Sequence, residues 1–166
     1  MELPADYDIR YSVPEDLSFV ESWFSDPIER RLYPFETDKE TEEALKNWIG
    51  FAKFKASLTG TIGGKPCALG SLFLMPYRKV SHHCSFFLMV DPKARKKGIG
   101  TSMVRNLLHL GKTRFRLESM HAEVFEPSEL ISILKKLQFE MFARQENFIK
   151  IEGVGHTRVL MEHFFS

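Results

Sequence analysis

Apolar residues in the first fifty positions follow a strand pattern and then two helix patterns. Every second residue from 7 to 13 is apolar or aromatic, as in a half-buried strand. Capping-box sequences at residues 12–15 and 37–40 each precede a stretch with helical spacing. The apolar positions of these two stretches are Leu17, Val20, Trp23 and Phe24, then Leu45, Trp48, Ile49 and Ala52. The pattern predicts one strand followed by two helices.

Short apolar runs typical of strands begin at Ala56. Two of them, near 56–62 and 66–75, are separated by Gly63 and Gly64, which both accept the positive φ of a tight hairpin. A third run, 81–90, is continuously apolar at its end, which indicates a strand in the interior of a sheet.

The rest of the chain alternates helix and strand signals. A helix follows Gly98, with Gly111 as its expected C-cap, and a strand covers 118–125. Pro127 suits the first position of a further helix. A final hairpin takes up two stretches, near 139–151 and 157–165.

These elements predict an α/β fold. The order strand, helix, strand across 81–125 implies one pair of parallel strands, and the hairpins on either side imply antiparallel pairs. The sequence therefore predicts a mixed, mostly antiparallel sheet of about seven strands with helices on both faces. Its length fits a single domain over residues 1–166.

The composition is that of a globular protein, with 43% apolar residues and 27% charged residues of both signs. The longest apolar run, 86–90, is far shorter than the roughly 20 residues of a spanning helix, and no signal peptide is recognisable. We therefore expect a cytoplasmic protein without a membrane partner. Cys67 and Cys84 lie inside apolar runs, which favours buried reduced thiols over a disulfide framework or a zinc site.

Charge is distributed unevenly along the chain. Residues 78–116 contain 10 basic residues against 1 acidic residue, whereas residues 1–50 contain 5 against 13. A basic segment of this kind usually marks an anionic ligand: nucleic acid, a membrane surface or a phosphorylated cofactor.

The segment 90–101 carries the clearest chemical signal. It lies between a buried strand and an amphipathic helix, and Gly98 and Gly100 let an anion approach the free N–H groups of the helix start. Four cations precede the glycines, which fits a pyrophosphate. The spacing matches neither the phosphate loop of nucleotide hydrolases nor the three-glycine dinucleotide motif, and a solvated basic turn is the alternative interpretation.

This segment resembles the cofactor motif of the GNAT superfamily of acyl-CoA-dependent N-acyltransferases, Q/R-x-x-G-x-G/A after a strand ending in V-D-P. Residues 95–100 match the motif and residues 90–92 match its lead-in. The resemblance implies acetyl-CoA as co-substrate, without a metal, and a sheet that splays between the 81–90 and 118–125 strands. It implies that the pantetheine arm bonds Leu88, Met89 and Val90, and that the pyrophosphate is held by Arg95, Lys96, Lys97, Gly98, Ile99, Gly100 and Thr101.

In this family a neutral amine attacks the thioester directly, so a base must take the ammonium proton and a backbone donor must meet the oxyanion. The resemblance implies the Met89 or Val90 amide as that donor. For the base, Glu123 and its following valine are similar to the E-V pair of some protein N-terminal acetyltransferases. A glutamate on the solvent side of a strand is the alternative interpretation. His82 and His83 are the other catalytic candidates, and adjacent strand residues point to opposite faces.

One position departs from the family pattern. Many relatives carry N-x-x-A-x-x-x-Y-x-x-x-G-F, and counting back from Phe139 puts Leu134 where the tyrosine protonates the departing thiolate. Leu134 is interpreted as core, so either another group supplies the proton or the thiolate leaves unprotonated. Glu126 is a further base candidate, although the helix dipole alone explains a carboxylate at a helix start.

The resemblance also points to an acceptor pocket shaped by the first two helices and the last hairpin. Its implied residues are Trp23, Tyr33, Pro34, Phe35, Glu36 and the 152–157 loop. The 13 acidic residues of the first fifty suit a cationic acceptor, such as an amine-bearing metabolite, an aminoglycoside or a peptide N-terminus. A solvated acidic face is the alternative.

The leading hypothesis is therefore transfer of an acetyl group from acetyl-CoA to a primary amine of a small molecule or peptide. The alternative is a catalytically weak, GNAT-like protein that binds acyl-CoA. Nucleic-acid binding by the basic segment ranks last, because the cations gather around glycines at a helix start and no recognised binding module accompanies them. We expect a monomer or homodimer with no nucleic-acid partner.

Overall fold

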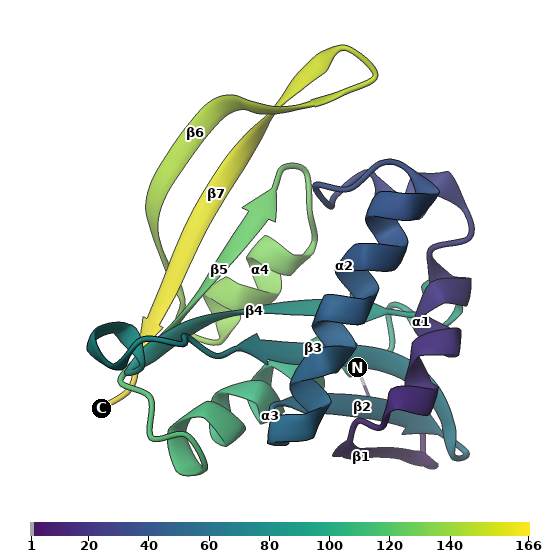
Figure 1. The fold of residues 1–166 in the computed structure, drawn as a ribbon, viewed down its shortest axis with the longest axis vertical. Helices are drawn as coiled ribbons and strands as arrows, with labels where there is room; N and C mark the ends of the chain where they lie inside the picture. The colour runs from purple at the N-terminus through teal and green to yellow at the C-terminus, as the bar shows by residue number, and fades with distance from the viewer. Residues whose placement is uncertain (1) are drawn as a thin grey trace.

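The computed structural model describes residues 2–166, which form one seven-stranded sheet with helices on both faces (Figure 1). The strands are β1 (Tyr7–Tyr11), β2 (Ser57–Ile62), β3 (Lys65–Phe73), β4 (His83–Val90), β5 (Ser119–Phe125), β6 (Glu140–Ile151) and β7 (Val154–Phe164). The α-helices are α1 (Leu17–Trp23), α2 (Asp38–Gly50), α3 (Ile99–Thr113) and α4 (Leu130–Lys136).

The strand order across the sheet is β1-β2-β3-β4-β5-β7-β6. Neighbouring strands are antiparallel except β4 and β5, which are parallel because α3 connects them as a crossover. This topology confirms the mixed, mostly antiparallel sheet predicted from the sequence.

The parallel pair β4 and β5 parts after a short stretch. The two strands pair over three residues each, from His83 and Ser119 to Ser85 and His121. Beyond this point β5 turns away (Figure 1), and β4 continues to Val90 with a partner only in β3. The predicted splay is confirmed, and it leaves one edge of β4 open.

The two faces of the sheet carry separate apolar cores. Phe86 and Leu88 of β4 belong to the cluster covered by α3 and α4, whereas Phe87 and Met89 belong to the cluster covered by α1 and α2. Because strand side chains alternate between faces, this assignment fixes which residues of β4 and β5 share a face.

Asp16 anchors the start of α1. Its buried carboxylate accepts hydrogen bonds from Arg10 (2.9 and 2.7 Å), the Val13 N–H (3.0 Å) and the Thr59 hydroxyl (2.8 Å). Burial opposes the charge on Asp16, but these bonds outweigh it and lower the pKa of the carboxyl. Ser12, the expected cap, bonds the Thr59 hydroxyl instead (2.7 Å). The N-cap is Val13, one residue later than predicted, and only its N–H takes part in the capping box, by donating to Asp16.

Two helix boundaries differ from the sequence expectation. Gly111 lies inside α3, which continues to Thr113, so it is not the C-cap. A Cβ at Gly111 would lie 2.7 Å from the Met120 sulfur, so glycine allows the helix to pack closely against the strand. The last helix begins at Leu130 and not at Pro127. The Ser128 hydroxyl accepts the Leu130 N–H (3.2 Å) and so satisfies a first-turn donor.

Tight turns join both hairpins. Gly63 and Gly64 have φ of 58° and 82°, which confirms the predicted turn between β2 and β3. Glu152 and Gly153, with φ of 52° and 79°, form the turn between β6 and β7. The expected loop at 152–157 is therefore a two-residue turn, and its remaining residues belong to β7.

Cys67 and Cys84 are free and buried, as predicted. Burial raises the pKa of Cys67 to about 11 and that of Cys84 to about 12, so both stay protonated thiols. In the described chain, 2–166, no helix has the length and apolar character needed to cross a membrane. Nor do His, Cys, Asp and Glu side chains within this range form a group of three or more that could hold a metal ion.

Candidate active site

The parting of β4 and β5 opens a cleft with a volume of about 1570 Å³. Residues 85–90 of β4 line one wall and residues 122–124 of β5 line the other. The start of α3, most of the segment 28–34 between α1 and α2, the region 127–136 around α4 and single residues of α2, β3, β6 and β7 also line it. The cleft therefore lies where the sequence places a cofactor segment beside an acceptor segment.

The start of α3 has N–H groups available to an anion. Its N-cap is Gly98, with φ of 79° and no side-chain cap, and the first hydrogen bond of the helix runs from the Ser102 N–H to the Gly98 carbonyl (3.1 Å). The N–H groups of Ile99, Gly100 and Thr101 precede that bond. A Cβ at Gly100 would lie 3.2 Å from the Ile133 side chain, so glycine keeps α3 close to α4. This end of the cleft suits a phosphate.

Nine of the ten predicted cofactor residues line this cleft, and Lys97 is outside its lining. The nine are Leu88, Met89, Val90, Arg95, Lys96, Gly98, Ile99, Gly100 and Thr101. Their roles stay predictions, because the structure shows their positions and not a bound cofactor.

Backbone groups of β4 alternate between its paired and open edges. The Asp91 N–H donates to the Cys67 carbonyl in β3 (2.8 Å). Counting back by alternation, Met89 directs its backbone groups toward β3, whereas Leu88 and Val90 direct theirs toward the open edge. Of the two amides considered as oxyanion donors, the Val90 amide is therefore the one on the open edge.

Tyr33 reaches from the α1–α2 segment to this edge. Its hydroxyl donates to the Leu88 carbonyl (2.8 Å) and lies 3.4 Å from the Met89 sulfur. Burial raises the pKa of Tyr33, so the phenol stays protonated. Phe35 stacks on the Tyr33 ring, with ring centroids 5.4 Å apart, and so helps to fix its position.

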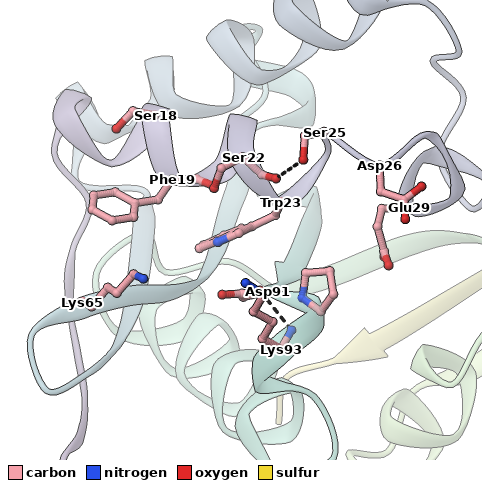
Figure 2. Close-up of a pocket in the computed structure, with 11 residues that line it drawn as sticks. Ser18, Phe19, Ser22, Trp23, Ser25, Asp26, Glu29, Lys65, Asp91 and Lys93 are labelled. Atoms are coloured by element: carbon pink, nitrogen blue, oxygen red, sulfur yellow. Dashed lines mark hydrogen bonds between the residues drawn. The ribbon is translucent and has the colours of Figure 1, made fainter.

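A second link joins the same segment to the cofactor loop. Glu29 forms an ion pair with Arg95 at 2.6 Å. Of the other predicted acceptor residues, Pro34 lines the cleft, whereas Phe35 and Glu36 do not, and Trp23 lines a separate cavity of about 610 Å³. Figure 2 shows this second cavity, where Trp23 faces Lys65, Asp91 and Lys93.

Glu123 lies on the opposite wall of the cleft. Burial alternates along β5, with Ala122 and Val124 in the core and Glu123 exposed, so the glutamate faces out of the core. Its Oε2 accepts a hydrogen bond from Arg158 of β7 (2.9 Å). The Arg158 guanidinium also bonds Gln145 and stacks on the Phe148 ring, 3.9 Å from its centroid.

His82 and His83 do not line the cleft. His83 begins β4, where β4 and β5 are still paired, and its ring lies 5.5 Å from that of His121. The histidine that does line the cleft is His156, whose Nδ1 bonds the Glu126 carbonyl (3.1 Å). His156 falls within the 152–157 stretch that the sequence assigned to the acceptor pocket, but no local pattern singles it out.

Glu126 and Leu134, the two other positions considered from the sequence, have structural surroundings. Glu126 forms an ion pair with Arg144 at 3.2 Å. Leu134 is fully buried in the core between α4 and the sheet, so the position of the family's tyrosine offers no proton donor.

Comparison with known proteins decides the family. The model of the Acetyltransferase (GNAT) family matches residues 17–133. The chain belongs to this family. No curated protein matches the sequence.

Solved GNAT-like structures share its fold. The Salmonella typhimurium protein YncA, whose structure contains its cofactor acetyl-CoA, superposes with a TM-score of 0.80 at 14% identity, over 96% of this chain and 94% of that one. An N-acetyltransferase from Staphylococcus aureus gives 0.81 at 17% identity, over 96% and 99%. The ribosomal-protein-S18-alanine N-acetyltransferase of Escherichia coli gives 0.73 at 18% identity, over 94% and 92%.

The GNAT assignment agrees with the chemistry of the cleft. An uncapped helix start with two glycines lies beside the Arg95 and Lys96 side chains, which fits a pyrophosphate. The open edge of β4 presents backbone groups that have no partner strand, although the Leu88 carbonyl accepts from Tyr33, which fits an amide-bearing arm.

Proposed function

We propose that this GNAT protein transfers an acetyl group from acetyl-CoA to a primary amine of a small molecule or peptide. One observation carries the proposal: an uncapped helix start, an open strand edge and the Glu123 carboxylate line the same cleft. When bound, acetyl-CoA supplies an acetyl group already activated as a thioester.

Residues of the chain would hold the cofactor by backbone and charge. The N–H groups of Ile99, Gly100 and Thr101 would receive the pyrophosphate, and the Arg95 and Lys96 side chains would neutralise it. The Leu88 N–H and the Val90 carbonyl, both on the open edge, would pair with the pantetheine amides.

The chemistry then needs a base and an oxyanion donor. The Glu123 carboxylate would take the ammonium proton, because an ammonium cannot attack a thioester. The Val90 N–H, on the open edge of β4, would donate to the developing oxyanion. Holding both reactants in one cleft supplies much of the remaining rate.

Leu134 favours a second candidate function, a catalytically weak protein that binds acyl-CoA. With leucine in place of the family's tyrosine, no phenol from α4 protonates the thiolate. Tyr33 is a poor substitute for it, because its hydroxyl already donates to the Leu88 carbonyl and burial raises its pKa. Turnover would then require that the thiolate leaves unprotonated or takes its proton from another group.

The remaining sequence expectations stay predictions: a single domain over 1–166, a cytoplasmic location, a monomer or homodimer, and no nucleic-acid or membrane partner.

Thiol release from acetyl-CoA over a panel of amines tests the proposal, with mass spectrometry to detect the N-acetylated product. We expect release that depends on the amine. Binding of acetyl-CoA without turnover of any amine would favour the second candidate.

A further inference from the structure

The face of the cleft that surrounds Glu123 is defined by strand register. Phe73 of β3 pairs with Ser85 of β4, and Ser85 pairs with His121 of β5, at the last rung before the strands part. One step further along the same face, Ser85 is followed by Phe87 and His121 by Glu123. Phe87 and Glu123 therefore project from the same face of the sheet, one on each side of the opening.

The wall opposite Glu123 is aromatic. Trp48 of α2 stacks on Phe87 with ring centroids 3.5 Å apart, and Phe73 stacks on Phe87 at 5.6 Å. All three line the cleft, and Tyr33 adjoins Trp48 at 5.7 Å. The Glu123 carboxylate and these aromatic rings therefore line the same cleft from its two sides.

The acidic start of the chain contributes little charge to the cleft. Of the 13 acidic residues in the first fifty, only Glu29 lines the cleft, and it is already paired with Arg95. Besides Arg95 and Lys96, which we assign to the pyrophosphate, the cleft lining contains three basic side chains and three acidic ones. One of the acidic three, Glu123, is paired with Arg158. The acidic start of the chain therefore does not provide a multiply charged acceptor site.

We propose that the acceptor is a primary monoamine carried on an apolar body, aromatic or branched aliphatic. Its amine lies at Glu123 and its body packs on the wall formed by Trp48, Phe73 and Phe87. This inference rests on the proposed function and names the substrate class of the same site.

The apolar wall suits the acceptor better than a long acyl chain of the donor. Leu32 and Ile28 of the α1–α2 segment also line the cleft, and they are 38% and 57% exposed. The same cleft therefore offers exposed apolar side chains to a molecule that enters from solvent. A chain attached to the thioester would need an enclosed pocket.

The first test measures amine binding without turnover, by calorimetric titration into protein saturated with CoA. Across methylamine, propylamine and pentylamine we expect affinity to rise by up to about fourfold per methylene. 2-Phenylethylamine should bind about tenfold or more tightly than spermidine or kanamycin. Equal or tighter binding of the two polycations would overturn the inference.

A matched pair of variants tests whether apolar residues of the cleft cause the preference for apolar amines. Leu32→Gln replaces an exposed apolar residue of the cleft, and Val154→Gln makes the same change at an exposed residue outside the cleft lining. We expect Leu32→Gln to weaken 2-phenylethylamine by about tenfold and to leave spermidine unchanged. Val154→Gln should change neither. Equal effects of both variants would contradict the assignment of the apolar wall.

Turnover of the same amines with acetyl-CoA separates this inference from the proposed function. Acetylation that prefers spermidine or kanamycin would leave the transferase standing and overturn the monoamine assignment. Apolar monoamines that bind as expected but are not acetylated would leave the binding site standing and overturn the transferase. Hexanoyl-CoA used faster than acetyl-CoA would assign the apolar wall to the donor and overturn the inference.

Discussion

At the scale of single residues, the surroundings of Glu123 come from distant parts of the chain. Alternation along β5 was enough to predict that Glu123 faces out of the core. Its partner Arg158 is 35 positions away, and the Phe148 ring that supports the guanidinium comes from β6. Such contacts depend on sheet pairing, which no local sequence pattern encodes.

Replacing Glu123 by glutamine tests the base. We expect kcat to fall by about 10²–10⁴-fold near neutral pH, with little change in acetyl-CoA affinity, because the carboxylate acts in proton removal. Raising the pH should restore part of the rate, since free amine becomes available without the base. Glu118→Gln, just before β5 and outside the cleft lining, is the control for charge loss. Wild-type rates across pH for Glu123→Gln would move the assignment to other residues.

Gly98 has two roles that a pair of variants separates. At φ of 79° any side chain costs roughly 1–2 kcal/mol, and a side chain there also obstructs the anion site at the start of α3. Gly64, at φ of 82° in the β2–β3 turn, carries the same strain with open space around it.

We therefore expect Gly98→Val and Gly64→Val to lower Tm by a similar ~2–8 °C. Only Gly98→Val should weaken acetyl-CoA, by about tenfold or more, equivalent to ~1.4 kcal/mol. Calorimetric titration of both folded variants measures the difference. Unchanged acetyl-CoA affinity in Gly98→Val would remove the phosphate site from this helix start.

At the scale of elements, every predicted strand and helix is present, and the errors lie at their ends. The Thr37 cap of α2 is confirmed by its bond from the Glu40 N–H (3.1 Å). The prediction of Gly111 as a C-cap is wrong, because the neighbouring sequence does not show whether a glycine ends a helix or packs against a strand. Only the position of Met120 in space distinguishes the two.

Asp16 ties β1, the start of α1 and β2 together, and its titration gives stability a pH dependence. The folded-state pKa of Asp16 is lowered, so the unfolded chain takes up the proton first as pH falls. Its contribution is complete above its ordinary pKa of about 4 and is lost as pH falls through the lower folded value.

Asp16→Asn should therefore lose roughly 1–3 kcal/mol at pH 7 and show a flatter decline of stability below about pH 5. Urea unfolding of both proteins between pH 3 and 7 measures this difference. Glu42→Gln is the control, because Glu42 forms an exposed ion pair with Lys46 within α2. This substitution should change the free energy of unfolding little. Parallel pH profiles for Asp16→Asn and wild type would contradict the role of Asp16.

At the scale of the whole molecule, the two halves of the cleft differ in how far sequence predicts them. The half proposed to bind the cofactor is contiguous, from the end of β4 to the start of α3, so one motif identifies it. The half proposed to bind the acceptor is assembled from the α1–α2 segment, β5 and the final hairpin. Side chains such as Trp48, Phe87 and His156 meet there only through the fold.

Binding of acetyl-CoA by the cofactor half should stabilise the whole fold. A ligand bound only by the native state adds about 2.7 kcal/mol at 100 times its dissociation constant. For 166 residues this corresponds to a rise in Tm of roughly 5–11 °C, measured by thermal unfolding with increasing acetyl-CoA. Short duplex DNA at the same concentration is the control for the basic segment, because clustered Lys and Arg would bind phosphates of either ligand. A rise in Tm with acetyl-CoA that exceeds the rise with DNA and persists in added salt would show that the cleft prefers acetyl-CoA. A larger, salt-sensitive shift with DNA would instead make nucleic acid the ligand of residues 78–116.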